Sequence, residues 1–377
     1  MPQIKPEVET FARIKVVGVG GSGKNALNHM INSKIKGIDF IAVNTDAQDL
    51  HNSLAKKRIH IGKNLTKGLG AGMNPEIGKR AAEETKEEIQ EAIKGADMVF
   101  IAGGEGGGTG TGAAPVVART AKEAGVLTIA VVTKPFSFEG PQRMKLAEAG
   151  IEELRKVVDA IIVVPNDKLF SVVSKDTPAP LAFTMCDEIL RQAVEGISDL
   201  ITTPGTIGNI DFADIRAVLE NAGSALMGIG TASGEKRAEE AAKAAINSPL
   251  IDLSIHGAKG VLFSIAGGND LTMFEIQDAA KIVTESVDPN AKIIFGTVND
   301  EKLKKGEVKV TVVAAGFPDQ TPKKTLFEGA EKGKIFNSMP SKEEVAEKAQ
   351  TQAVQQPEED SDDWSAVPAF LRRSKLK

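Results

Sequence analysis

The sequence predicts an α/β protein with a largely parallel β-sheet, and three observations support this fold class. Short apolar runs rich in β-branched residues recur at 13–19, 39–44, 58–62, 97–103, 126–132 and 159–165. Helical patterns at 75–94, 112–124 and 140–157 separate most of them, and this alternation is typical of the βαβ crossovers of a Rossmann-like sheet with helices on both faces. Segments rich in glycine, asparagine or aspartate follow the strands, so we expect them to meet at the carboxyl edge of the sheet, where such folds bind ligands.

The second half of the chain predicts a long central helix followed by a smaller α/β domain. Pro178 stands at the start of that helix and Pro204-Gly205 follows its end, as is common at helix boundaries. Further strand patterns at 224–230, 260–267, 291–298 and 307–316 alternate with helical patterns at 211–221, 235–247 and 271–285. The predicted organisation is an N-terminal extension at 1–11, an N-terminal α/β domain at 12–177, the central helix at 178–203, a C-terminal domain at 204–317, a disordered linker at 318–363 and a terminal peptide at 364–377.

Composition excludes several classes of protein. A net charge of −5 with 26% charged residues argues against a general nucleic-acid or lipid-headgroup binder. The single cysteine, Cys186, excludes an internal disulfide framework and a multi-thiolate metal site, and the four histidines lack metal-site spacing. No signal-peptide pattern and no apolar run of about 18 residues is present. We therefore expect a cytoplasmic protein without direct membrane insertion and without a dedicated metal cluster.

A first glycine-rich loop fits several nucleotide signatures. The stretch VGVGGSGKN at 17–25 reads as G-x-G-x-x-G, and it also reads as G-x-x-x-x-G-K. Asn25 stands where a Walker A motif requires Ser or Thr. Each signature places a phosphate at a helix N-terminus, so this loop predicts a phosphate site without choosing the nucleotide.

A second glycine-rich loop limits which nucleotide the chain can bind. The stretch GGEGGGTGTGAAP at 103–115 follows a strand and precedes a helix, and its backbone N–H groups can surround a polyphosphate. Thr109 and Thr111 add hydroxyl donors. Two phosphate cradles indicate a triphosphate held from two sides. A NAD-dependent Rossmann oxidoreductase remains an alternative because Asp46 follows the second strand at a spacing suited to a ribose contact, but it leaves the second loop unexplained.

GGGTGTG at 106–112 resembles the tubulin signature. Together with FIAVNTDAQ, GLGAGMNPEIG, TKPFSFEGPQR, VPNDKLF, NIDFADI and the terminal VPAFLRR, it makes residues 12–317 and the tail resemble the FtsZ family of tubulin-like GTPases of prokaryotic cell division. The resemblance implies a GTP-binding domain at 12–177 and a GTPase-activating domain at 204–317. It also implies GTP or GDP with Mg²⁺ as cofactors, and head-to-tail filaments in a cytoplasmic ring at mid-cell. A non-hydrolysing tubulin-like scaffold is the other alternative.

The resemblance also assigns residues to the nucleotide. Phosphate contacts fall on Gly20, Gly21, Ser22, Gly23, Lys24, Asn25, Gly70, Ala71, Gly72, Gly107, Gly108, Thr109, Gly110, Thr111 and Gly112, while Glu139, Arg143, Asn166, Phe183 and Asp187 read the sugar and base. Phe183 would stack on a purine and Asp187 would accept hydrogen bonds from guanine N1–H and N2–H₂, which favours GTP over ATP. We expect Lys24 to be a solvated charge at the opening of a helix rather than a Walker lysine.

The family's catalytic loop corresponds to Asn209, Asp211 and Asp214, which one subunit inserts into the nucleotide pocket of the next. Asp211 and Asp214 are three apart at a helix start, so they can polarise a water for attack on the γ-phosphate. Simple helix capping is the alternative role for this pair. Because such a contact is heterologous, it propagates into an open filament.

The tail resembles the peptide through which the family meets membrane-tethering and regulatory cell-division proteins. Its candidate partner-binding residues are Val367, Pro368, Phe370, Leu371, Arg372 and Arg373. No nucleic-acid partner is expected. One departure from the family stands in the second loop: Glu105 replaces the usual apolar residue. A carboxylate near a polyphosphate is repulsive unless it points away or meets Mg²⁺, so we expect Glu105 to weaken nucleotide affinity if it faces the phosphates.

Overall fold

The computed structural model describes residues 12–171, 176–203, 210–248, 255–268, 270–299 and 303–317. The predicted N-terminal extension, linker and terminal peptide, together with Asn209, lie outside the described residues.

The described strands form one sheet, in the order β3-β2-β1-β4-β5-β6-β7-β10-β8-β9. Pairing is parallel from β3 through to β6, which confirms the predicted parallel sheet. These strands are β1 (Ile14–Val19), β2 (Ile38–Asn44), β3 (Lys57–His60), β4 (Met98–Gly104), β5 (Leu127–Lys134) and β6 (Ala160–Pro165).

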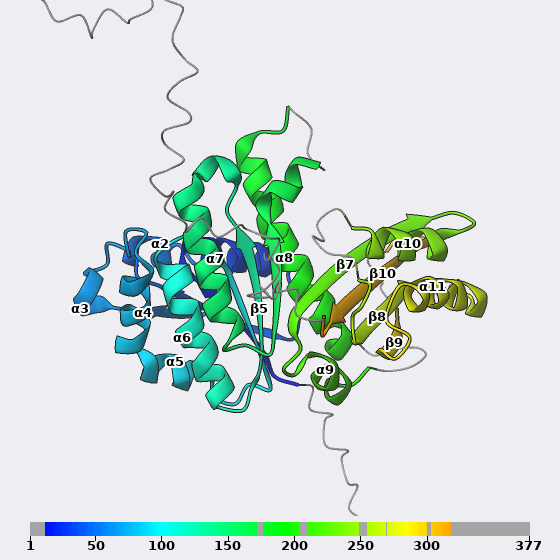
Figure 1. The fold of residues 1–377 in the computed structure, drawn as a ribbon, viewed down its shortest axis with the longest axis horizontal. Helices are drawn as coiled ribbons and strands as arrows, with labels where there is room; N and C mark the ends of the chain where they lie inside the picture. The colour runs from blue at the N-terminus through cyan, green and yellow to red at the C-terminus, as the bar shows by residue number, and fades with distance from the viewer. Residues whose placement is uncertain are drawn as a thin grey trace, which may run out of the picture. The chain divides into compact units, whose positions relative to one another are not determined.

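Helices cover both faces of this parallel sheet because its strands alternate their apolar side chains between two buried clusters. Ile14 and Val16 of β1 pack with α1 and α8, whereas Val17 and Val19 pack with α4, α5, α6 and α7. Figure 1 shows α5, α6 and α7 side by side over one face. The helices are α1 (Gly20–Asn32), α4 (Pro75–Glu84), α5 (Lys86–Ile93), α6 (Thr109–Glu123), α7 (Pro141–Arg155) and α8 (Ala179–Thr202).

The strands of the second half continue the same sheet. Strand β7 pairs in parallel with the start of β6, while β10 runs antiparallel to both β7 and β8. Strand β9 is parallel to β8. These elements are β7 (Gly223–Ser233), β8 (Gly260–Gly267), β9 (Lys292–Asn299), β10 (Glu307–Ala315), α9 (Phe212–Leu219), α10 (Arg237–Ile246) and α11 (Met273–Glu285). The two predicted α/β regions are therefore hydrogen-bonded to each other through β6 and β7.

Helix α8 is the predicted central helix, and its 24 residues span about 36 Å. Its buried residues, Leu190 and Val194 among them, share one core with strands of both halves, including Ala225 of β7 and Val313 of β10. Although α8 is long, no helix in the described part of the chain is both long and apolar enough to cross a membrane.

Two local features differ from the sequence prediction. The helix expected at 75–94 divides into α4 and α5 at Thr85, whose hydroxyl donates to the carbonyl of Ala81 and accepts from the N–H of Gly62. Two short helices were not predicted, α2 (Ala47–His51) and α3 (Lys63–Thr66). Helices of four or five residues are too short to produce an amphipathic period.

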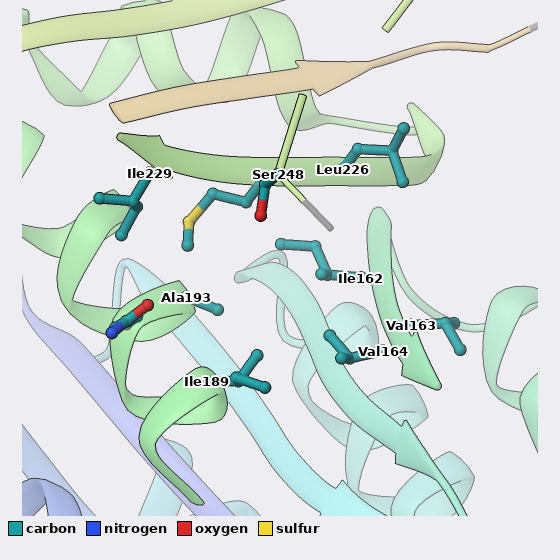
Figure 2. A pocket seen from close by; sticks show the side chains of 10 residues that line it. Ile162, Val163, Val164, Ile189, Ala193, Leu226, Ile229 and Ser248 are labelled. Carbon is teal, nitrogen blue, oxygen red and sulfur yellow. The ribbon is translucent and has the colours of Figure 1, made fainter. Parts of the chain in front are cut away.

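An apolar cavity of about 70 Å³ lies where α8 meets β6 and β7 (Figure 2). Ile162 and Val164 of β6, Ile189 of α8 and Leu226 of β7 contribute to its walls. Because its walls are mostly aliphatic, this cavity lacks the convergent polar groups that a nucleotide requires.

Candidate nucleotide-binding site

The two glycine-rich loops touch each other at the carboxyl edge of the sheet, as the sequence predicted. Gly20 opens α1 with a φ of 73°, and a Cβ there would lie 3.0 Å from the backbone nitrogen of Gly110. A Cβ on Gly104 would lie 2.8 Å from the hydroxyl of Ser22. Only glycine permits this approach of the two loops, so the N-termini of α1 and α6 share one rim.

A third loop closes against the second. A Cβ on Gly108 would lie 2.8 Å from both the Cβ of Ala71 and the backbone nitrogen of Asn74. Asn74 caps α4 by accepting from the N–H of Glu76. By contrast, a Cβ on Gly107 would have no atom within 4 Å. The second loop therefore borders open space at Gly107, and its N–H groups are of the kind that can bind a phosphate.

The loop after β2 contacts the second glycine-rich loop. The hydroxyls of Thr45 and Thr109 are 2.6 Å apart. Asp46, the basis of the oxidoreductase alternative, caps α2 by accepting from the N–H of Asp49 at 2.9 Å. Its carboxylate is therefore engaged in local structure rather than poised for a ribose.

Lys24 is not the solvated charge that the sequence suggested. Its side chain is buried, and its Nζ lies 2.7 Å from Asp49 Oδ1. Asp49 Oδ2 accepts from Asn44 Nδ2 at 2.8 Å. The expectation was wrong because α2, which the sequence did not reveal, brings an acid against the first turns of α1.

Phe183, which the sequence assigned to the base, belongs to an aromatic cluster larger than the sequence indicated. Phe136 is buried, and its ring lies 5.4 Å from that of Phe183, edge to face. Phe138 and Phe170 also pack on Phe136, at 5.0 and 5.4 Å. Phe183 remains 48% exposed, so part of it is free to stack on a base. The phenylalanines in PFSFEG and NDKLF were the signal for this cluster.

Asp187 lies one turn after Phe183 on α8. Burial raises its pKa to about 6, and the nearby charges of His29 and Lys24 oppose the rise. His29 itself is bonded to Glu188 at 2.8 Å. Asp187 is therefore a partly desolvated acceptor whose charge is lost just below neutral pH.

Two side chains assigned to the ribose and base carry unpaired polar atoms. Asn166 Oδ1 and Arg143 Nε are buried and lack a hydrogen-bond partner among the described residues. Arg143 also pairs with Glu139, whose Oε2 lies 2.8 Å from Nη1. Since buried polar groups are normally satisfied, Asn166 and Arg143 are incompletely hydrogen-bonded within the described part of the chain.

The Glu105 side chain is directed toward α7, where its Oε2 would lie 2.5 Å from a Cβ on Gly150, rather than toward the open space at Gly107. It is 3% exposed, and its pKa is raised to about 7, mainly by burial.

Asp211 and Asp214 lie far from these loops. Asp211 caps α9, and the two side chains accept from each other's backbone N–H groups at 2.8 and 3.3 Å. Helix α9 leads into β7, whose first residue pairs with Ala160 at the amino end of β6. The phosphate loops follow the opposite ends of the strands, and Figure 1 shows α9 near the other end of the sheet. The acid pair therefore cannot reach the nucleotide site of its own chain.

Comparison with known proteins agrees with this geometry. The model of the Tubulin/FtsZ family, GTPase domain, matches residues 13–174, and that of the FtsZ family, C-terminal domain, matches residues 223–318. The structure of an empty FtsZ dimer from M. jannaschii is 50% identical, covers 82% of this chain and 89% of that chain, and gives a TM-score of 0.77. A point mutant of the same M. jannaschii protein gives 50% identity, coverages of 82% and 92%, and a TM-score of 0.77.

A more distant neighbour shows the fold alone. CetZ2 from Haloferax volcanii, in a GTPγS-bound protofilament, is 22% identical over 81% of this chain and 94% of that chain, with a TM-score of 0.69. Two family models in chain order and half-identical structures over most of the length leave no room for the oxidoreductase alternative. This chain belongs to the FtsZ family of tubulin-like GTPases.

Proposed function

We propose that this chain binds GTP with Mg²⁺ at the three glycine loops and hydrolyses it only when a second copy supplies Asp211 and Asp214. The observation that supports the proposal is that the glycine loops and the Asp211–Asp214 pair lie at opposite edges of one sheet. A head-to-tail contact would unite them, and repetition of that contact makes a filament.

The individual assignments follow the site's chemistry. The N-termini of α1 and α6 would hold the phosphates through backbone N–H groups, with Thr109 and Thr111 adding hydroxyls. Mg²⁺ would neutralise charge on the phosphate oxygens. Phe183 would stack on guanine and Asp187 would accept from its edge, while Asn166 and Arg143 would contact the nucleoside.

The acid pair would act on the neighbour's bound GTP. Asp211 Oδ1 already accepts from Asp214 N–H, but a carboxylate offers further lone pairs that can orient a water. Capping and catalysis are thus compatible in one pair, since the cap holds both carboxylates in place for the next subunit. Asn209, which lies outside the described residues, is proposed to assist them.

Localisation and partners extend the proposal. We expect filaments of this chain to assemble in the cytoplasm at mid-cell, with the peptide at 364–377 captured by membrane-tethering or regulatory proteins through Val367 to Arg373. We also propose the domain boundaries that the sequence predicted, from the extension at 1–11 to the terminal peptide at 364–377.

Complementation between two inactive variants tests hydrolysis in trans. Asp211→Asn keeps an intact pocket, and Asp187→Ala keeps an intact acid loop. Each alone should release little phosphate, while an equimolar mixture should regain a substantial fraction of wild-type activity, because some contacts join an intact pocket to an intact loop. A mixture no more active than its components, with both variants folded and Asp211→Asn still binding GTP, contradicts hydrolysis in trans. A wild type that binds GTP but releases no phosphate at any protein concentration favours the non-hydrolysing scaffold instead.

A further inference from the structure

Glu105 is a buried acid at the root of the second glycine loop that the proposed chemistry does not use. Its N–H donates to the carbonyl of Thr133 on β5 at 2.9 Å, which continues the β4–β5 pairing by one residue. Its side chain is 3% exposed. A carboxyl group is therefore held inside the protein, one residue before the glycines that border the phosphate space.

The contacts of Glu105 connect it to the first turn of α6. Its side chain shares a hydrogen bond with Thr111. Thr111 Oγ1 also accepts from the N–H of Gly106 at 2.8 Å, so the Thr111 hydroxyl donates to Glu105. The chain Gly106–Thr111–Glu105 ties both ends of the loop to one carboxyl group.

The other carboxyl oxygen is unpaired. Glu105 Oε2 is buried and has no hydrogen-bond partner among the described residues. It lies against α7 at Gly150, where a Cβ would be only 2.5 Å away. A charged carboxylate in this position is poorly satisfied, whereas a neutral acid loses much less on burial.

Among the described residues, no charged group on the surrounding elements forms an ion pair with Glu105. On α7, Arg143 is paired with Glu139. Glu76 and Lys79 of α4, Arg119 of α6 and Glu153 of α7 line a groove to which Thr111, Gly112 and Gly150 also contribute. Lys134, at the end of β5, lines a different groove that also contains Glu148, Glu152 and Arg155 of α7.

Burial is accordingly the main influence on the pKa of Glu105. It raises this pKa to about 7, and the hydrogen bond from Thr111 opposes the rise.

We propose that Glu105 is an affinity-determining residue of the nucleotide site: its neutral form admits the polyphosphate, and its carboxylate form opposes it. The inference rests on the proposed function, because it takes the second loop as the phosphate site. Two negative charges close together in a medium of low dielectric repel each other strongly. Bound phosphates would consequently favour the neutral acid.

The direction of the pH effect follows from linkage. If nucleotide raises the pKa of Glu105 above its value in the free protein, binding takes up a proton once the pH exceeds about 7. Affinity then falls as pH rises through that value, by up to about tenfold per pH unit. It levels off again above the pKa of the complex.

Calorimetric titration of the full chain with Mg²⁺ and GDP at pH 6.5, 7.5 and 8.5 tests this, because GDP avoids turnover. Wild type should lose affinity toward pH 8.5. Repeating the pH 7.5 titration in buffers of different ionisation enthalpy should reveal proton uptake. Glu105→Gln keeps the shape and the Thr111 contact without the charge, so its affinity should be independent of pH over this range and its proton uptake should vanish. Glu105→Met, which places an apolar side chain at this position, should show the same pH-independent affinity and serves as the second variant if Glu105→Gln folds poorly.

Two controls separate the outcomes. Glu152→Gln removes one exposed charge from the neighbouring helix α7 and should retain the alkaline loss. Guanosine, which lacks phosphates, should bind equally at all three pH values. Alkaline loss that persists in both folded Glu105 variants overturns the inference, as does a wild type with no alkaline loss. Absence of GDP binding at every pH instead contradicts the proposed function itself.

Discussion

Asp211 and Asp214 bond to each other's backbone at the start of α9, with Asp211 Oδ1 accepting from Asp214 N–H at 2.8 Å and Asp214 Oδ2 accepting from Asp211 N–H at 3.3 Å. The pair that we assign to hydrolysis is therefore also the N-terminal cap of its helix. Substitutions that separate the two roles are the informative ones.

Asp211→Asn should abolish hydrolysis without loss of stability, since Asn caps a helix as well as Asp does. Asp211→Ala should lose both, with a fall of about 1 kcal/mol in the free energy of unfolding. Phosphate release should drop by about 100-fold or more in each. Urea unfolding beside a phosphate assay measures both effects. Asp211→Asn with wild-type turnover would show that this carboxylate is a cap alone.

Asp187 should impose an acid limit on GTP binding. Its pKa is about 6, and guanine recognition requires the ionised form, so affinity should fall as pH drops below 6 and the carboxylate gains a proton. Fluorescence titration with a labelled GTP between pH 5 and 7.5 should show this fall. In Asp187→Asn the dependence should disappear along with the preference for GTP over ATP. A wild-type affinity that is unchanged at pH 5 would remove Asp187 from base recognition.

Lys24→Met should destabilise the protein because Asp49 would lose its ion-pair partner. Since the Asp49 side chain is 29% exposed, we expect about 1–2 kcal/mol rather than the larger loss typical of a fully buried pair. The double variant Lys24→Met/Asp49→Asn should recover part of that loss. Denaturant unfolding of the four proteins completes the cycle. Strict additivity would mean that the pair contributes no coupling.

Gly150→Ala should disturb the phosphate loop from behind. The new Cβ would lie 2.3 Å from Thr111 Cγ2 and 2.5 Å from Glu105 Oε2, so α6 or α7 must shift. We expect a loss of about 1–3 kcal/mol in unfolding free energy and weaker GDP binding. Glu148→Ala, at an exposed position on the same helix, is the matched control. If the two variants have equal unfolding free energies and equal GDP affinities, the packing around Gly150 accommodates the new Cβ without cost.

Glu105 should also make stability depend on pH. Its pKa rises from 4.5 to about 7 on folding, so the folded protein is favoured while the group is neutral, and stability declines as pH rises from 4.5 through 7. Glu105→Gln should therefore gain stability over wild type at pH 8, by up to about 3 kcal/mol, and gain nothing at pH 4. Thermal or urea unfolding at the two pH values measures this. An equal difference at both values would exclude ionisation as its cause.

Much of the fold could be predicted because it depends on local pattern. The apolar runs gave six parallel strands within a residue or two of their observed bounds. The period of the central helix, with prolines at both ends, located α8. The periodicity of apolar residues in a strand or a helix is a property of consecutive residues, so it can be recognised in a single sequence. The short helix α2 has no such period, and with it Asp49 was missed.

The residues of the candidate site also fall into those that the sequence predicted and those that it did not. The glycine loops, Phe183, Asp187 and the DFAD acids were predicted from motifs, and parallel strands necessarily bring loops after successive strands to one edge. Phe136 at the centre of the aromatic cluster was not predicted, because its contacts come from η1 and η2 (Ser137–Glu139 and Asn166–Ser171) and from α8.

By itself, the sequence determined the fold class and the family, and it supplied the residues that we propose for the two half-sites, since spacing and residue type along the chain carry that information. Only the tertiary structure decided that Lys24 is buried against Asp49, that Glu105 is enclosed behind the phosphate loop, and that the two halves share one sheet. Burial and charge pairing depend on which distant segments come together, and desolvation, which sets the ionisation of Glu105 and Asp187, exists only once they have packed.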